Sequence, residues 1–187
     1  VSDSQLIPVG LVSVYRRLGR LEDATAAAKE ALQKSTSNLA LYNELGQAYL
    51  EAGEYPLARF VFEKALNGVA GADTDANIQS NLGRTFVALS DEWTAEVYYK
   101  KALELDPTLV SALLGLSEIY LDKRNYKSVV PLLEDAIKAD PTNFGMMLNL
   151  GVAYRGVGRI TDAVAITQRA KEVNTSDPST LFNLALL

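Results

Sequence analysis

The sequence contains neither cysteine nor histidine. These two absences exclude disulfide bonds, thiol nucleophiles, imidazole bases and almost every kind of zinc site. A run of about 18 apolar residues is also missing, so we expect no transmembrane helix and no direct insertion into a membrane. No spacing of residues typical of a metal or cofactor site occurs, and we therefore expect the protein to need no cofactor.

Positive charge is scarce as well. The chain has 18 Lys and Arg against 23 Asp and Glu, which gives a net charge of −5. Surfaces that bind phosphate backbones need clustered Lys and Arg, so we expect no nucleic-acid partner. The first ten residues, VSDSQLIPVG, lack the basic start and apolar core of a signal peptide, and they also lack an initial Met. We expect the chain to be part of a longer protein, and the sequence leaves its compartment open.

What the sequence does contain is a repeat. Small residues recur at intervals of 37, 34, 34 and 34 residues, at Gly46, Gly83, Ser117, Gly151 and Ala185. A fixed period of this length is typical of helical repeat arrays. The one longer interval places a three-residue insertion in residues 67–75, a stretch whose Gly and Asp content predicts a surface loop.

Each repeat unit predicts two helices joined by a turn. An aromatic side chain follows the small residue by three positions, on the same helical face, at Tyr49, Phe86, Tyr120 and Tyr154. Pro56 suits the first turn of a second helix, because its missing N–H has no partner there in any case. The sequences Leu-Asp-Pro at 105–107 and Ala-Asp-Pro at 139–141 predict where two of the second helices end.

This pattern resembles the tetratricopeptide repeat, a helix-turn-helix unit of 34 residues. The unit that begins at Leu39 carries the resemblance best, through Tyr42, Leu45, Gly46, Tyr49, Ala58, Phe62 and Ala65. The units that begin at Gln5 and Phe144 match more loosely, and we expect Pro8 to lie in the first turn of its helix.

The resemblance implies an all-α fold, a right-handed superhelical solenoid of stacked repeats. A single unit cannot bury its own apolar face, so neighbouring units are expected to form one continuous core. We expect one array over residues 1–187, with repeats at 5–38, 39–75, 76–109, 110–143 and 144–177 and a truncated sixth repeat at 178–187.

The resemblance also implies a non-catalytic scaffold or adaptor that binds a peptide or protein segment in a concave groove. The first helices would line this groove through positions next to the small residues, namely Asn43, Gln47, Asn77, Ser80, Arg84, Leu114, Glu118, Leu148, Val152, Arg155 and Phe182. The polar N-terminal members suit peptide amides or a carboxylate, and the apolar C-terminal members suit a helix or a hydrophobic anchor. The alternative for Leu148 and Phe182 is that they only pack against the neighbouring helix.

Two more specific activities are not expected. Relatives that grip the C-terminal carboxylates of heat-shock proteins need Lys residues in their groove-lining helices, and the corresponding helices here contain none. The glycine-rich stretch GVAYRGVGR lacks the Lys-Ser or Lys-Thr that ends a phosphate-binding loop, so we interpret it as a helix end and a turn.

Two rival functions stay open. The first is a homo-oligomer that assembles through the apolar C-terminal segment STLFNLALL, and the second is a substrate-recruiting region of a larger enzyme.

Among the aromatic residues, Trp93 is expected to pack in the core rather than form an exposed contact, because large aromatic side chains are usually buried. Tyr99 fits the core, whereas its neighbour Tyr98 is expected to be free.

Overall fold

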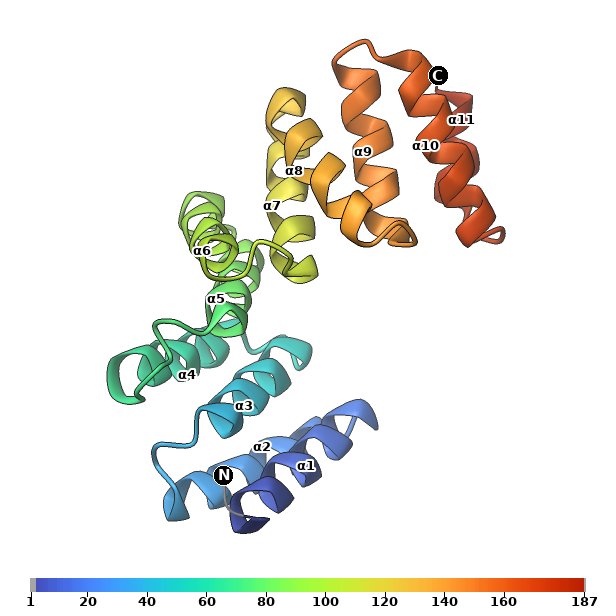
Figure 1. The fold of residues 1–187 in the computed structure, drawn as a ribbon. Helices are drawn as coiled ribbons and strands as arrows, with labels where there is room; N and C mark the ends of the chain where they lie inside the picture. The colour runs from blue at the N-terminus through green and yellow to red at the C-terminus, as the bar shows by residue number, and fades with distance from the viewer. Residues whose placement is uncertain (1–2, 187) are drawn as a thin grey trace. The chain divides into compact units, whose positions relative to one another are not determined.

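A computed structural model of the chain describes residues 3–186. This part of the chain forms eleven α-helices and no β-strand (Figure 1). The helices are α1 (Asp3–Arg17), α2 (Leu21–Lys34), α3 (Leu39–Glu51), α4 (Tyr55–Gly68), α5 (Ala76–Ala88), α6 (Glu92–Leu105), α7 (Val110–Asp122), α8 (Tyr126–Ala139), α9 (Phe144–Gly156), α10 (Ile160–Val173) and α11 (Pro178–Ala185). The all-α prediction is confirmed.

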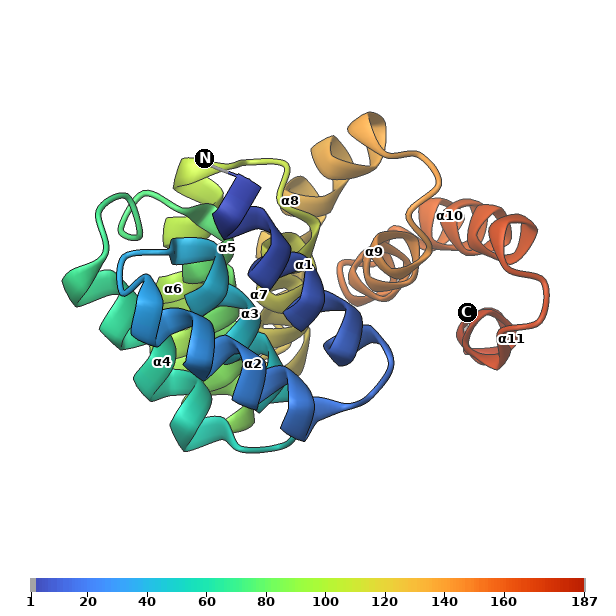
Figure 2. The same cartoon turned by 90° about the horizontal axis from the view of Figure 1, so that it is seen from below.

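The helices form two compact units. The first unit, Val1–Leu105, contains α1 to α6, and the second unit, Asp106–Leu187, contains α7 to α11. Within each unit, consecutive helices form hairpins, and Figure 2 shows α11 next to the α9–α10 hairpin, both of whose helices it contacts. Each unit is therefore a stack of helical hairpins, as expected for a helical solenoid.

Each unit has one layer of first helices and one layer of second helices. In the first unit, α3 contacts both α1 and α5, while α2 packs on α1 and α3 and α4 packs on α3 and α5. The second helices stay apart from one another: within the described residues, no Cα atom of α2 comes within 8 Å of a Cα atom of α4. Within a unit, each hairpin therefore contacts the next one through the first helix of that next hairpin, which packs on both helices of the hairpin before it.

Small residues allow the two helices of a hairpin to approach closely. A Cβ atom added at Gly46 of α3 would lie 2.4 Å from the ring of Phe62 in α4, and one at Gly83 would lie 2.7 Å from the ring of Tyr99. Phe62 is completely buried, as are the small side chains that line the same interfaces, Ala58, Ala65, Ala95 and Ala102. The regularly spaced small residues of the sequence are thus contact points of the helix layers.

The ends of the helices follow from local chemistry. Asn38, Asp75, Asn143 and Asp177 each accept a hydrogen bond from a backbone N–H at the start of the first helix that follows it. Pro56 lies in the first turn of α4, and the helices α6 and α8 end at Leu105 and Ala139, directly before Asp-Pro, as predicted.

The inserted segment is a loop with buried anchors. The helix α4 ends at Gly68 and α5 begins at Ala76, so residues 69–75 form the connection between the two hairpins. Within it, Val69 is 7% exposed and Ala72 is fully buried. The extra residues thus add apolar contacts while the rest of the loop stays at the surface.

Three expectations about single residues are wrong. Pro8 lies inside α1 rather than in its first turn, because the helix already begins at Asp3. Trp93 is 76% exposed. It precedes the buried Ala95 by two positions, about 200° around the helix, so it points away from the core. Tyr98 is not free, because its ring stacks on Phe86 with 5.4 Å between ring centroids.

Candidate functional site

In the first unit, the predicted groove residues lie on α3 and α5. Asn77 and Arg84 are exposed, and Asn43 and Gln47 are half-buried. Ser80 is only 2% exposed, so it lies within the packing between helices. The side chains available to a partner on this face are therefore two exposed polar groups on α5 and two partly covered amides on α3.

A hydrogen bond connects the two helices of this polar face. The side-chain amide of Asn81 on α5 donates to Asn43 Oδ1 on α3 at 2.8 Å. The backbone carbonyl of Asn81 in turn accepts a hydrogen bond of 2.7 Å from the Thr85 hydroxyl. The face is thus partly preorganised, since Asn43 is already oriented by a neighbouring helix.

An ion pair connects the first helices α1 and α3, as the asparagine hydrogen bond connects α3 and α5. The guanidinium of Arg16 bonds to Glu44 at 3.0 Å and also to Glu51. Burial alone lowers the pKa of Arg16, but the hydrogen bonds to the two carboxylates outweigh this effect and raise the pKa. Arg16 and Glu44 are both largely covered, so this pair joins the two helices rather than offering charge to a ligand.

In the second unit, the predicted residues lie on α7, α9 and α11. Leu114, Leu148, Val152 and Arg155 are half-buried, while Glu118 is exposed. Desolvation, followed by repulsion from the Asp122 carboxylate, raises the pKa of Glu118. The surface on this unit is therefore mostly aliphatic, with one cation and one carboxylate.

The apolar members of this set differ in their contacts. Leu114 packs on α9, where its Cδ2 atom would lie only 3.3 Å from a Cβ atom at Gly145. Phe182 is 66% exposed, so packing against the neighbouring helix does not account for its position. Val152 and Arg155 border a narrow gap beside Asn183 of α11 that is too small to hold a water molecule. The structure thus brings Val152 and Arg155 together, while Leu114 belongs mainly to the helix interface.

A second asparagine bridge joins α7 and α9. The side-chain amide of Asn149 donates to Ser117 Oγ at 2.9 Å, and the Ser117 hydroxyl donates to the backbone oxygen of Leu114 at 2.8 Å. The sequence reasoning missed both asparagines and the Arg16–Glu44 pair. A shared signal was present, because the bridging residues Glu44, Asn81 and Asn149 each lie two positions before the small residue of their repeat.

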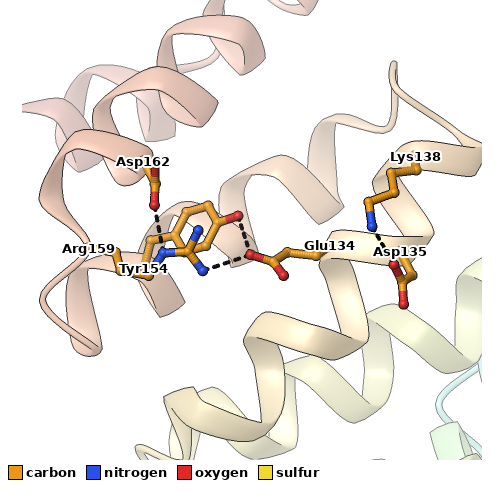
Figure 3. Close-up of polar contacts among 6 residues, drawn as sticks. All are labelled: Glu134, Asp135, Lys138, Tyr154, Arg159 and Asp162. Atoms are coloured by element: carbon orange, nitrogen blue, oxygen red, sulfur yellow. Dashed lines mark hydrogen bonds and ion pairs between the residues drawn. The ribbon is translucent and has the colours of Figure 1, made fainter.

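The opposite side of the second unit carries a polar network (Figure 3). The Tyr154 hydroxyl and Arg159 Nη1 both donate to Glu134 Oε1 at 2.8 Å, and Arg159 Nε donates to Asp162 at 2.6 Å. These donors lower the pKa of Glu134, with the Tyr154 bond as the largest cause. Burial, reinforced by the Glu134 bond, raises the pKa of Tyr154 to about 12. The network links α8 to α9 and α10.

Among residues 3–186, no group of three or more acidic side chains is arranged to hold a metal ion. None of the described helices combines the length and the apolar character that a bilayer crossing requires. The surface chemistry on the first helices is that of hydrogen bonding and apolar contact.

Two matches to known protein families identify the family of this chain. Two family models described as tetratricopeptide repeat match residues 36–108 and 114–178. The chain belongs to the tetratricopeptide repeat (TPR) family. TPR proteins generally act as scaffolds for protein interactions, and the expectation of a helical-repeat fold of a protein-binding family is confirmed.

Individual TPR proteins share the fold at low sequence identity. The chain superposes on PilW, a "widely conserved type IV pilus biogenesis factor", with a TM-score of 0.80 and 19% identity over 99% of this chain and 89% of the other. It superposes on YrrB, "a TPR protein with an unusual peptide-binding site", with a TM-score of 0.72 and 21% identity over 95% and 90% of the two chains. At these identities the likeness shows the fold alone.

The curated relatives are longer proteins. Anaphase-promoting complex subunit 7 from Arabidopsis thaliana is 25% identical over 152 residues, which are 81% of this chain and 27% of that protein. Two further relatives are matched over 10% and 16% of their own lengths. The TPR region described here therefore corresponds to less than a third of each of these relatives.

Proposed function

We propose that this TPR chain is a non-catalytic scaffold that binds a peptide or protein segment along the face of its first helices. The observation that carries the proposal is the prearranged polar face of the first unit. There Asn81 orients Asn43 at 2.8 Å, and the guanidinium of Arg84 is exposed on the same helix as Asn81. Amide and guanidinium groups are suited to the backbone amides and carboxylates of an extended segment.

The second unit contributes apolar contact in this proposal. Leu148 and Val152 are half-buried on α9, and the exposed ring of Phe182 lies on α11. We also propose that the repeats of both units belong to one array, because the 34-residue phase continues from Gly83 to Ser117 without an insertion. In this proposal the first unit offers polar groups to a bound segment, and the second unit offers apolar contact.

The test is affinity capture from native cells with matched variants. The variant Asn77→Ala/Arg84→Glu alters the two exposed groups of the polar face, and the control Lys101→Glu makes the same change in net charge at an exposed lysine of the second helix α6. We expect wild type and control to enrich the same partner and the face variant to lose it while keeping its helical circular dichroism. A face variant that retains every partner of the wild type would refute the proposed site.

A second candidate is self-association through α11. Two adjacent side chains of this helix, Leu181 and Phe182, are 57% and 66% exposed. Exposed apolar side chains of this size favour association with another apolar surface. Light scattering over a concentration series tests this candidate: a mass that rises with concentration, and that Leu181→Ser/Phe182→Ser returns to the monomer value, supports it, and a constant monomer mass contradicts it.

A further inference from the structure

The second helices of the first unit border a hollow that the proposed function does not use. It lies between α2 and α4, with α3 as its floor, and has a volume of about 400 Å³. Tyr42, Leu45 and Tyr49 of α3 form the floor. This hollow, named the α2–α4 trough below, exists because the second helices do not pack on each other.

The walls of the trough are apolar, although they face solvent. Leu57 and Phe60 on α4 line it and are 44% and 62% exposed, and Leu32 lines it from α2. The volume lies within the range of about 300–1,000 Å³ that is usual for ligand sites. A large apolar side chain placed here would cover exposed aromatic and aliphatic surface on both walls.

The charge around the trough has one sign. Lys29 on α2 and Lys64 on α4 line it, and none of the described residues that line it is acidic. The ammonium of Lys29 lies 5.3 Å from the ring centroid of Tyr49, over the floor. The carboxylates next in sequence are engaged elsewhere, since Glu30 pairs with Lys34 and Glu63 pairs with Arg59. In a chain with a net charge of −5, this is a local cationic site.

The corresponding hollow in the second unit shows a different arrangement. It lies between α8 and α10 over α9, with Glu134, Lys138, Tyr154 and Arg169 among its lining residues. Glu134 has the repeat position of Lys29, and Tyr154 has that of Tyr49. There the polar groups satisfy one another, because Glu134 binds Tyr154 and Arg159, and Lys138 binds Asp135 (Figure 3). The hollow between α8 and α10 therefore does not share the cationic, apolar character of the α2–α4 trough.

We infer that the α2–α4 trough is a second binding site, which takes an acidic protein segment with a bulky apolar side chain between carboxylates. The apolar side chain fills the hollow over Tyr42 and Tyr49, and the carboxylates meet Lys29 and Lys64 on the two bordering helices. Two cations on opposite walls suit carboxylates on both sides of an apolar anchor. A fatty acid, with its single carboxylate at one end, matches this arrangement less well.

The test uses a phage-displayed library of random 12-residue peptides, selected on the whole chain. We expect the enriched peptides to carry an aromatic or branched aliphatic residue flanked by Asp or Glu. For synthetic copies of these peptides, Lys29→Glu/Lys64→Glu is expected to raise Kd about tenfold or more, as reversal of two charge contacts implies. The control Lys101→Glu/Lys171→Glu makes the same change in net charge at exposed lysines of α6 and α10, outside the trough, and is expected to leave Kd unchanged.

The outcomes separate the two sites. Peptide-induced shifts of the backbone amide signals of Leu45, Tyr49 and Phe60, together with loss of binding in Lys29→Glu/Lys64→Glu, support the trough. Enriched peptides without acidic residues, or peptides that bind Lys29→Glu/Lys64→Glu as tightly as wild type, overturn it. Peptides that instead lose affinity for Asn77→Ala/Arg84→Glu would overturn the trough as their site and support the first-helix face. Failure of the face variant to lose any partner leaves the trough result unaffected.

Discussion

Asn81 on α5 donates a 2.8 Å hydrogen bond to Asn43 on α3 and so joins two consecutive first helices of the polar face. A bond between two neutral side chains of this kind contributes about 1 kcal/mol to stability. Because both amides are half-buried, the loss of one leaves the other without this partner.

Replacement of Asn81 by Ala is therefore expected to lower the free energy of unfolding by about 1 kcal/mol. The matched variant Asn77→Ala removes an exposed amide from the same helix, and we expect it to change stability by less than about 0.5 kcal/mol. Urea unfolding followed by circular dichroism measures both values. Equal effects of the two substitutions would contradict a specific role for the Asn81 bond.

Gly46 lies where the packing of α3 against α4 leaves no room for a side chain. A methyl group at this position would lie 2.4 Å from the buried ring of Phe62, so α3 and α4 would have to move apart. We expect Gly46→Ala to destabilise the protein by about 1–3 kcal/mol, the usual cost of overpacking a core.

Gly10 provides the control for this prediction. It lies inside α1 and a Cβ atom added there has no neighbouring atom within 4 Å. Because Ala is the better helix former, Gly10→Ala is expected to stabilise the protein by about 0.5–1 kcal/mol. Thermal unfolding of the two variants should therefore shift in opposite directions, and a shift of both to higher temperature would show that helix propensity outweighs the Phe62 contact.

The Glu134 network predicts a dependence of stability on pH. Hydrogen bonds from Tyr154 and Arg159 lower the pKa of Glu134 in the folded chain. The network therefore stabilises the protein above the unfolded pKa of about 4.3, and this contribution is lost as the pH falls through the lower folded pKa. We expect Glu134→Gln to be less stable than wild type near neutral pH and the difference to shrink toward about pH 3.

Denaturant titrations at a series of pH values measure this difference. Glu172→Gln is a suitable control, because it removes an exposed carboxylate of α10 outside the network. Its difference from wild type should vary less with pH than that of Glu134→Gln. If the Glu134→Gln difference stays constant from neutral to acid pH, the network does not set the pKa of this carboxyl group in solution.

Trp93 is the one tryptophan of the chain, and its 76% exposure predicts its fluorescence. Iodide, which reaches exposed indole rings, should quench the emission of the folded protein nearly as strongly as that of the chain unfolded in urea. Strong protection in the folded state would mean that another molecule or a second copy covers α6. Measurement at several protein concentrations distinguishes a second copy from the folded monomer.

The regular spacing of small residues helped to predict the helical hairpins, because Gly46 and Gly83 lie where the two helices of a hairpin approach closely. The same spacing did not predict the position of Trp93. Aromatic character favours burial, but two residues along a helix reverse the direction of a side chain. The angle between Trp93 and the buried Ala95 around the helix decides that Trp93 faces solvent. The sequence contains this information, but the prediction followed the general tendency of tryptophan to be buried.

The polar contacts between helices were harder to predict. The contact of Asn81 was not predicted, because a single sequence does not show which asparagine faces a neighbouring hairpin and which faces water. Lys29 and Glu134 occupy the same repeat position with opposite charge, so the repeat pattern alone gives no information about the troughs between second helices. The choice of groove residues such as Gln47 and Arg84 stays a prediction until a partner is bound.

The separation of α2 and α4 has a mechanical consequence. The layer of first helices is joined by side-chain bonds such as Arg16–Glu44 and Asn81–Asn43, whereas the second helices of neighbouring hairpins share no close backbone contact. A change in the distance between α2 and α4 therefore breaks no direct contact between these two helices and acts only on their packing against α3 and α5, whereas a separation of the first helices breaks the side-chain bonds between them. We accordingly expect the first unit to bend more easily in the direction that changes the width of the trough than in the direction that would disturb the polar face.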